Sequence, residues 1–301
     1  MRLDKGFLPA KKDAGFKMDG YYIWCSSVIY EESRFYMFAS RWPEDTKFPE
    51  GYMTHSEIVL ATTDDLSKPF EFKKVIISGR DGNYWDSAMA HNPFVIKIND
   101  EYVMYYIGTP DGSYEKRAIG YATAKTLDGE WQRMDNPVVL PPNANNPAAL
   151  IDNDGSVLLY FRDGKLKVSV ARAKTYDGEY KIENDNLFPE SKIEDIFVFF
   201  NDGRYEMIAE DAIATYTGLE KAGVYFISDD GINWRTSDKP LIYDFNVEYT
   251  DGTSITLQRR ERPQIINVDG RVYLFNGVKA GGLDKLTGGH TWNMVQEIYV
   301  E

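Results

Sequence analysis

Three carboxylates stand at the starts of two related segments of the chain. Glu194 and Asp195 precede the apolar run Ile-Phe-Val-Phe, and Glu261 precedes a matching run that begins at Pro263. Buried carboxylates that lie close together raise the pKa of one of them. An acid can then be held beside an ionised base at neutral pH, so the three residues are candidates for acid/base catalysis. In the alternative interpretation, Glu194 or Glu261 pairs with Arg259, Arg260 or Arg262 and only fastens parts of the fold together.

The segment that carries these carboxylates recurs along the sequence. Each copy has an apolar strand, a turn of Asp, Asn or Gly, and a second strand rich in aromatic residues, which is the pattern of a β-hairpin. A third strand follows, and the aromatic residue at the end of its tail opens a fourth. The mid-points of the five second strands, spaced by 67, 55, 48 and 67 residues, are Met37, Met104, Leu159, Met207 and Leu274.

Five copies of four strands predict an all-β fold, a five-bladed β-propeller with four-stranded antiparallel blades. The last copy ends with its third strand, so we expect residues before Tyr21 to supply the missing outer strand and close the ring. A single repeat cannot bury both faces of its sheet, and residues 1–301 are therefore expected to form one domain. A two-sheet sandwich is the alternative.

In a propeller, the first strand of each blade lines the central channel. The two positions that precede the proline position of these strands carry almost no aliphatic side chains, which core packing would not select. These positions are Trp24-Cys25, His91-Asn92, Asn145-Asn146, Glu194-Asp195 and Glu261-Arg262. They are expected to surround a polar mouth at one end of the channel.

Composition narrows the class of partner. The protein has 34 Lys and Arg against 47 Asp and Glu, a net charge of −13, which repels nucleic acid and anionic membrane surfaces. Its one cysteine cannot form an intramolecular disulfide and is compatible with a reducing compartment. The start of the sequence lacks the apolar core of a secretory signal. We therefore expect a cytoplasmic protein, or a periplasmic or secreted one if a leader has been removed.

The five repeats resemble the glycosidase propellers, the group that contains glycoside hydrolase family 43 and relatives in families 32, 62, 117 and 130. Blades of that group open with an acidic or polar residue, Pro, an apolar pair, a Gly turn and Tyr-Tyr-Leu-Phe. Glu261-Arg262-Pro263 and Glu194-Asp195-Ile196 match the Glu-x-Pro form that carries the general acid there. The resemblance covers nearly the whole sequence and implies a glycoside hydrolase that removes a terminal sugar from a small oligosaccharide or glycoside.

In that interpretation, Glu261 or Glu194 protonates the departing oxygen. Asp195 or Asp86 activates a water molecule or sets the pKa of the acid. The sequence departs from family 43 because the expected base falls on Cys25 and its second-blade counterpart falls on Asn92. Either the acids have moved to the fourth and fifth blades, or His91 and Asp86 supply part of the function. His91 is otherwise a neutral sugar partner or a core residue.

Other residues suit sugar binding. Aromatic faces stack on sugar rings, and a guanidinium such as that of Arg41 can clamp an acidic sugar. The tryptophans considered are Trp24, Trp42, Trp85 and Trp292, with burial between blades as the alternative. Cys25 is a small channel-lining residue or, if a base lowers its pKa, a thiolate. The remaining candidates are Glu57, Asn92, Asn146, Arg259, Arg262 and His290.

No cofactor is expected, because the three histidines lack metal-ligand spacing. The resemblance leaves open a Ca²⁺ ion in the central channel, near His290. Two further functions stay open. One is a phosphorylase of the family 130 type, which needs a cluster of cations such as Arg41, Arg259, Arg260 and Arg262. The other is a saccharide-binding propeller without catalysis.

Overall fold

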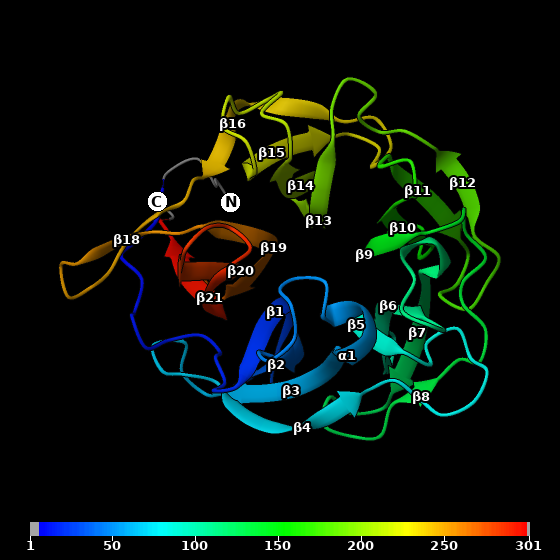
Figure 1. Cartoon of the computed structure of the whole chain (residues 1–301). Helices are drawn as coiled ribbons and strands as arrows, with labels where there is room; N and C mark the ends of the chain where they lie inside the picture. Colours follow the sequence, from blue (N-terminus) through cyan, green and yellow to red (C-terminus); the bar gives the residue numbers. More distant parts are fainter. Residues whose placement is uncertain (1–5, 300–301) are drawn as a thin grey trace.

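The computed structural model describes residues 6–299, which form sheets arranged around a central axis (Figure 1). The predicted all-β five-bladed propeller is confirmed. Blade 1 contains β1 (Tyr21–Glu31), β2 (Arg34–Pro43), β3 (Glu57–Thr63) and β4 (Glu71–Ile77), and blade 2 contains β5 (Met89–Ile98), β6 (Glu101–Thr109), β7 (Ala118–Ala124) and β8 (Gln132–Arg133). Blade 3 contains β9 (Asn145–Ile151), β10 (Val157–Arg162), β11 (Val168–Ala173) and β12 (Lys181–Asn184). Blade 4 contains β13 (Ile193–Asn201), β14 (Arg204–Asp211), β15 (Ala222–Ser228) and β16 (Arg235–Tyr243).

Blade 5 contains β19 (Arg259–Val268), β20 (Arg271–Gly282) and β21 (Gly288–Ile298). A small hairpin of β17 (Asn246–Glu248) and β18 (Ser254–Thr256) precedes it. Two short helical turns, α1 (Tyr52–His55) and η1 (Tyr114–Lys116), lie in loops of blades 1 and 2. Within residues 6–299, no helix is long and apolar enough to cross a membrane.

The strand-to-strand turns follow from their residues. A two-residue hairpin turn of type I′ needs a positive φ at both central positions, which Gly, Asn and Asp tolerate best. Asp202 and Gly203 have φ values of 50° and 83°, and Asp269 and Gly270 have values of 52° and 80°. These turns join the first and second strands of blades 4 and 5 in antiparallel register. In blades 4 and 5, the predicted hairpins are therefore formed by the residues that indicated them.

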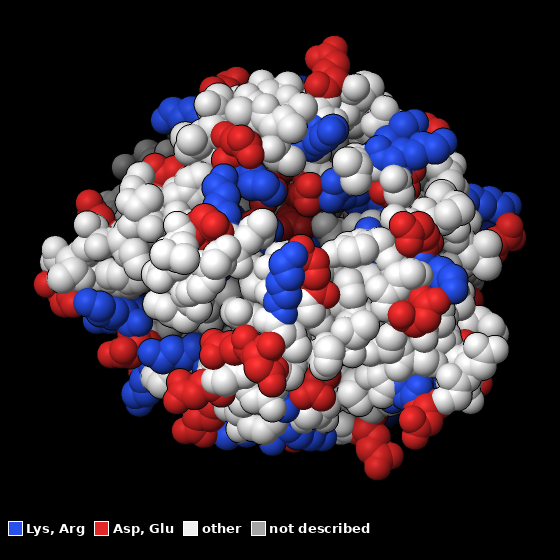
Figure 2. Space-filling view, viewed as in Figure 1, with Lys and Arg blue, Asp and Glu red and all other residues white. Residues whose placement is uncertain are grey.

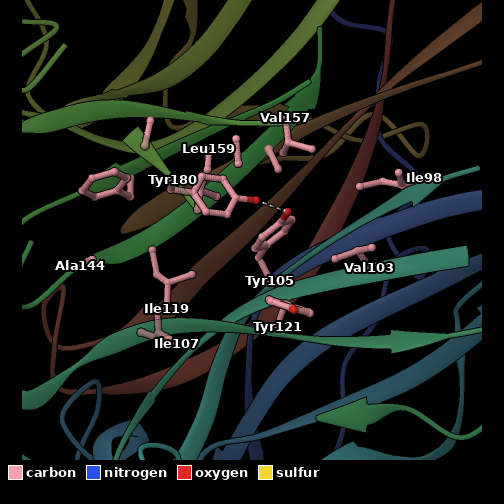
Figure 3. Packing of buried hydrophobic residues seen from close by; sticks show 14 of the residues in the cluster. Ile98, Val103, Tyr105, Ile107, Ile119, Tyr121, Ala144, Val157, Leu159 and Tyr180 are labelled. Carbon is pink, nitrogen blue, oxygen red and sulfur yellow. Dashed lines mark hydrogen bonds between the residues drawn. The ribbon is translucent and has the colours of Figure 1, made fainter. Parts of the chain in front are cut away.

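The apolar core lies between neighbouring blades. In the layer between blades 2 and 3, strand residues of both sheets interdigitate, and the hydroxyls of Tyr105 and Tyr180 are hydrogen-bonded at 2.7 Å (Figure 3). The equivalent methionines of the second strands, Met37, Met104 and Met207, are fully buried, as expected of core residues. Each blade thus depends on its neighbours for burial, which fixes the positions of the innermost strands.

The N-terminal segment runs along the outer edge of blade 5. The Leu8 amide donates to the Glu297 carbonyl at 2.9 Å, and Phe16 and Asn293 exchange two backbone hydrogen bonds of 2.9 Å. These contacts are isolated bridges beside β21 and not a regular fourth strand. Closure of the ring by this segment stays a prediction, as does the assignment of the whole protein to one domain.

Candidate active site

Each innermost strand bends at the same place. Five equivalent residues, one from each blade, have φ values between 52° and 55°, and they are Cys25, Asn92, Asn146, Asp195 and Arg262. The strand register shifts at these points, as in a β-bulge, which re-aims side chains. Left-handed backbone at a residue other than glycine costs of order 1–3 kcal/mol and gathers at functional sites. The bulges therefore mark one end of the axis as a functional site.

The five bulge residues form a ring across the axis, here called the floor ring. Asn92 Nδ2 donates to Asn146 Oδ1 at 2.8 Å, and Asn146 Nδ2 donates to Asp195 Oδ1 at 2.9 Å. Arg262 Nη1 donates to the same Asp195 oxygen at 2.7 Å, and the Arg262 amide donates to Asp195 Oδ2 at 3.2 Å. The side chains of four blades are thus tied together, and they close the channel below the site.

Above the floor ring lies a cavity of about 290 Å³, here called the funnel. Figure 2 shows a hollow at the centre of this face, with acidic side chains inside it and basic side chains beside it. Eleven predicted site residues line the funnel: Trp24, Cys25, Trp42, His91, Asn92, Asn146, Glu194, Asp195, Arg259, Glu261 and Arg262. The innermost strands and the end of β2 therefore bring these candidates together.

One wall of the funnel is aromatic. Trp42, at the end of β2, stacks on Phe48 with ring centroids 5.9 Å apart and planes inclined by 14°. Trp24 meets the same Phe48 edge-on at 5.7 Å. Tyr52 of α1 lies beside Trp42 and belongs to the same segment between β2 and β3 as Phe48. Such a wall is suited to the apolar face of a sugar ring.

His91 is buried between this wall and the floor ring. Its Nδ1 is 2.8 Å from Ser56 Oγ, its Nε2 is 3.6 Å from Cys25 Sγ, and its ring stacks on Tyr52 with centroids 4.4 Å apart. Burial lowers the pKa of His91 well below its usual value, and the positive charges of Arg262 and Arg117 lower it further. His91 is therefore neutral at neutral pH, which suits a hydrogen-bonding partner better than a proton donor.

Cys25 does not have the surroundings of a nucleophile. Its side chain is buried, and burial raises the pKa of the thiol far above the usual value, although Arg262 opposes the shift. A reactive cysteine needs the thiolate form. The structure therefore favours the interpretation of Cys25 as a small lining residue of the floor ring.

The opposite side of the funnel carries three ion pairs, two on the wall and one in the floor ring. Arg162 Nη1 lies 2.7 Å from Glu194, and Arg262 Nη1 lies 2.7 Å from Asp195. Arg259 holds Glu261 through two hydrogen bonds, of 2.6 Å from Nε and 3.1 Å from Nη2. For Glu261, the pairing with Arg259 that the sequence offered as an alternative is thus present. Glu194 pairs instead with Arg162, which the sequence did not indicate, and both carboxylates also line the funnel.

A fourth carboxylate, Glu210, lies behind this wall and was not predicted. It faces Glu194 across the β13–β14 pair, and one of its oxygens is within 4.8 Å of oxygens of both Asp195 and Glu261. Lys221 Nζ donates to it at 2.8 Å. Burial, with the charges of Glu261 and Asp195, raises the pKa of Glu210 well above its usual value. A sequence signal existed, because Glu210 and Asp211 directly follow the apolar run Met-Ile-Ala of β14.

The calcium ion that the resemblance left open stays a prediction. His290 lies on the exposed part of β21, stacked on Trp292 at 5.3 Å, and does not line the funnel. Asp195, Glu210 and Glu261 are close enough to share an ion. Each of the three also has an arginine or lysine partner, at 2.6–2.8 Å.

Comparison with known proteins finds no matching family model and no matching curated protein. Solved structures do match. A BT0996 RGII complex superposes with a TM-score of 0.79 at 16% identity, over 99% of this protein and 93% of the matched one. A thermostable family-43 glycoside hydrolase gives 0.69 at 14% identity, over 98% and 94%. Zg3597, a family 117 glycoside hydrolase of the marine bacterium Zobellia galactanivorans, gives 0.72 at 13% identity, over 98% and 90%. This is the propeller fold of glycoside hydrolases.

Six predicted site residues lie outside the funnel of this propeller: Arg41, Glu57, Trp85, Asp86, His290 and Trp292. Arg41 pairs with Glu57 at 2.7 Å and lies over the ring of Tyr21. The two charges therefore satisfy each other on β2 and β3. Trp292 is half-buried against the apolar cluster of blade 5 and the N-terminal segment.

Asp86 and Trp85 do not line the funnel, and Trp85 is buried between blades 1 and 2, as the alternative interpretation had it. Asp86 is fully buried, with Arg80 Nε at 2.7 Å, the Tyr106 hydroxyl at 2.8 Å and Arg133 Nη1 at 3.4 Å. Trp85 packs on the Tyr106 ring at 5.0 Å and donates from its indole to a backbone carbonyl. Both residues precede β5 and anchor the loop to blade 2, so Asp86 has a structural role.

Asp86→Asn is therefore expected to destabilise the fold by about 3–5 kcal/mol, because it leaves two partly buried arginines without their shared carboxylate. Chemical denaturation measures this change. The matched control is Asp135→Asn, which removes the exposed partner of Arg80 and should cost at most about 1 kcal/mol. A loss of turnover in folded Asp86→Asn protein, without loss of stability, would restore Asp86 to the candidate catalytic residues.

Several lining residues were missed. They are Phe48, Pro49, Tyr52, Tyr114, Arg117 and Arg162. Asn145 also lines the funnel, and it belongs to the blade pattern but is not among the predicted site residues. Most of the missed residues come from the loops between β2 and β3 and between β6 and β7. Those loops differ from blade to blade, so a search for the repeated unit passes over them.

Proposed function

We propose that this protein is a glycoside hydrolase that removes a terminal sugar from a small oligosaccharide or glycoside, with Glu194 as the general acid and Glu261 as its carboxylate partner. The observation that carries the proposal is that neighbouring blades present these two residues to one funnel in different surroundings. The glycoside hydrolases among the matched solved structures support it. The chemistry uses side chains alone, so the proposal includes no cofactor.

Glu194 is suited to donate a proton. Its side chain is 27% exposed, so it can reach a substrate in the funnel. Burial of the rest of the side chain raises its pKa, as do the charges of Asp195 and Glu261, whereas Arg162 lowers it. A raised pKa keeps part of the population protonated at the pH where a carboxylate partner is ionised.

Glu261 is suited to act as the carboxylate. The two hydrogen bonds from Arg259 fix its orientation, and its side chain is only 7% exposed. Asp195 is a poorer candidate, because its two oxygens accept three hydrogen bonds within the floor ring. Glu261 is therefore the better candidate for the catalytic carboxylate. Asp195 instead ties the floor ring together.

The reaction breaks the bond between C1 of the terminal sugar and the departing oxygen. Glu194 gives its proton to that oxygen, while the Glu261 carboxylate either attacks C1 or takes a proton from the attacking water. In the first case a second step with water releases the sugar and the configuration at C1 is retained, and in the second case it is inverted. NMR of the first-formed anomer distinguishes the two courses.

The shape of the funnel favours removal of a terminal sugar. The floor ring closes the bottom, and the space along the axis below it measures only about 20 Å³. A saccharide therefore has no exit through the propeller. An end of the saccharide can enter the funnel, whereas its middle cannot.

A phosphorylase is less well supported. Two of the four arginines considered for phosphate, Arg41 and Arg260, lie outside the funnel. Arg260 is fully buried and donates to Asn276 and Gln296. Release of a sugar phosphate that depends on inorganic phosphate would favour the phosphorylase over the hydrolase.

Arg162→Gln is expected to move the basic limb of the pH profile of kcat/KM to higher pH. The positive charge of Arg162 favours ionised Glu194, so its removal raises the pKa of Glu194 further and keeps the acid protonated at higher pH. The control is Arg271→Gln, which removes an exposed arginine outside the funnel. A basic limb that stays in place or moves to lower pH would exclude Glu194 as the group that sets it.

A further inference from the structure

The charges that line the funnel do not cancel. Its described residues include four arginines, Arg117, Arg162, Arg259 and Arg262, against the three carboxylates Glu194, Asp195 and Glu261. Arg162, Arg259 and Arg262 each pair with one of these carboxylates at 2.6–2.7 Å. No described carboxylate lies within ion-pair distance of Arg117. A protein with a net charge of −13 therefore keeps one uncompensated cation in this cavity.

Arg117 is fixed in place by neutral groups. It is half-buried, its Nε donates to Asn143 Oδ1 at 2.9 Å and to the Tyr114 carbonyl at 3.2 Å, and its guanidinium lies over the Tyr114 ring at 4.8 Å. Nη1 donates to the Tyr52 hydroxyl at 3.2 Å. These bonds use Nε–H and one Nη1–H of the five N–H groups of an arginine. Within residues 6–299, the other N–H groups have no hydrogen-bond partner.

A guanidinium held in this way is prepared for an oxyanion. Arginine matches a planar carboxylate with two parallel hydrogen bonds, and partial burial strengthens the pair. Tyr52, Tyr114 and Asn143 already order the Arg117 side chain in the free protein. A ligand therefore binds without the loss of side-chain entropy that ordering a mobile arginine requires.

Three other buried polar atoms of the described funnel residues have no hydrogen-bond partner. One is Arg162 Nε, whose guanidinium is already paired with Glu194, and the other two are neutral. Trp42 Nε1 and Asn92 Oδ1 are buried and have no hydrogen-bond partner, and both side chains are more than nine-tenths buried. They offer one donor and one acceptor to hydroxyl groups, and the aromatic wall offers a face for a sugar ring. The set matches a sugar with a single negative charge.

We propose that Arg117 is a specificity-determining residue that binds a carboxylate of the substrate, so that the funnel selects glycosides of uronic acids over neutral sugars. This inference rests on the proposed glycosidase function. Inorganic phosphate is an oxyanion too, and would use the same guanidinium if the protein were a phosphorylase. The carboxylate is favoured because only one unpaired cation is present, whereas a phosphate carries up to two charges at neutral pH.

The test uses aryl glycosides in matched pairs, glucuronide with glucoside and galacturonide with galactoside, in both anomers. Wild type is expected to prefer a uronide, and Arg117→Gln should lower the ratio of kcat/KM for uronide over neutral glycoside about 10- to 100-fold, as expected for a lost charge-assisted hydrogen bond. Arg117→Lys should recover part of the ratio. Lys116→Gln, which removes a neighbouring exposed charge paired with Asp111, should leave the ratio unchanged.

Calorimetry with free glucuronate, galacturonate, their neutral parent sugars and inorganic phosphate separates the two proposals. Uronate binding that is lost in Arg117→Gln supports the carboxylate site even if no glycoside is cleaved, in which case only the glycosidase proposal fails. If neutral glycosides are cleaved and Arg117→Gln does not change the ratio of kcat/KM for uronide over neutral glycoside, the carboxylate site is overturned. The glycosidase proposal then still stands. Phosphate binding that depends on Arg117, without uronate binding, overturns the uronide preference.

Discussion

Glu261→Gln is expected to lower kcat by about 10³–10⁴-fold for every glycoside that the protein cleaves. The amide keeps the size of the glutamate, yet it can neither attack C1 nor accept a proton from water. Because the loss affects the step at C1 itself, it should not depend on how easily the departing group leaves. Single-turnover rates with activated and unactivated glycosides measure the effect.

The matched control for Glu261→Gln is Glu297→Gln, in the same blade. Glu297 pairs with Arg271 on the surface, outside the funnel, and its replacement should leave kcat within about twofold of the wild-type value because exposed pairs contribute little. Denaturation curves establish that both variants are folded. A folded Glu261→Gln protein with wild-type kcat would remove Glu261 from the mechanism.

Glu194→Gln is expected to act selectively. For alkyl glycosides and natural saccharides, whose departing oxygen must be protonated, kcat should fall by about 10²–10⁴-fold. For dinitrophenyl glycosides, which release a stable anion, the loss should be far smaller. The basic limb of the pH profile should also disappear, because the raised pKa of Glu194 sets that limb in the wild-type protein.

Glu190→Gln serves as the control, because Glu190 is exposed and precedes β13 without lining the funnel. It should change neither the rate nor the pH profile. An equal loss on activated and unactivated glycosides in Glu194→Gln would show that Glu194 is not the proton donor. In that case Glu210, which is also held with a raised pKa, becomes the next group to examine.

The ring could be predicted because each blade repeats the same local signals. Turn pairs such as Asp202-Gly203 fix hairpins through the positive φ that they tolerate, and these turns recur at similar distances. The polar pair before the proline position was also informative. Its second member, such as Asn92 or Asp195, is the bulge residue that faces the axis in each blade.

The parts of the site that could not be predicted lack such a signal. Asp86 lies only five residues before His91, but the backbone turns between them. The Asp86 carboxylate therefore faces Arg80 and not the funnel. Glu210 reaches the site from a second strand, because β13 and β14 place it opposite Glu194. Arg117 comes from the loop between β6 and β7, which the repeated pattern does not include. Its role depends on which charges remain unpaired, and only the folded arrangement decides that.

The most direct test of the central proposal follows the oxygen atom of water. Wild type and Glu261→Gln are incubated in H₂¹⁸O with the matched uronides and neutral glycosides, and the released sugar is analysed by mass spectrometry. The proposal predicts a released terminal sugar with ¹⁸O at C1 for wild type and almost none for the variant. No cleavage by wild type of any saccharide that it binds, or equal labelling by both proteins, would contradict it.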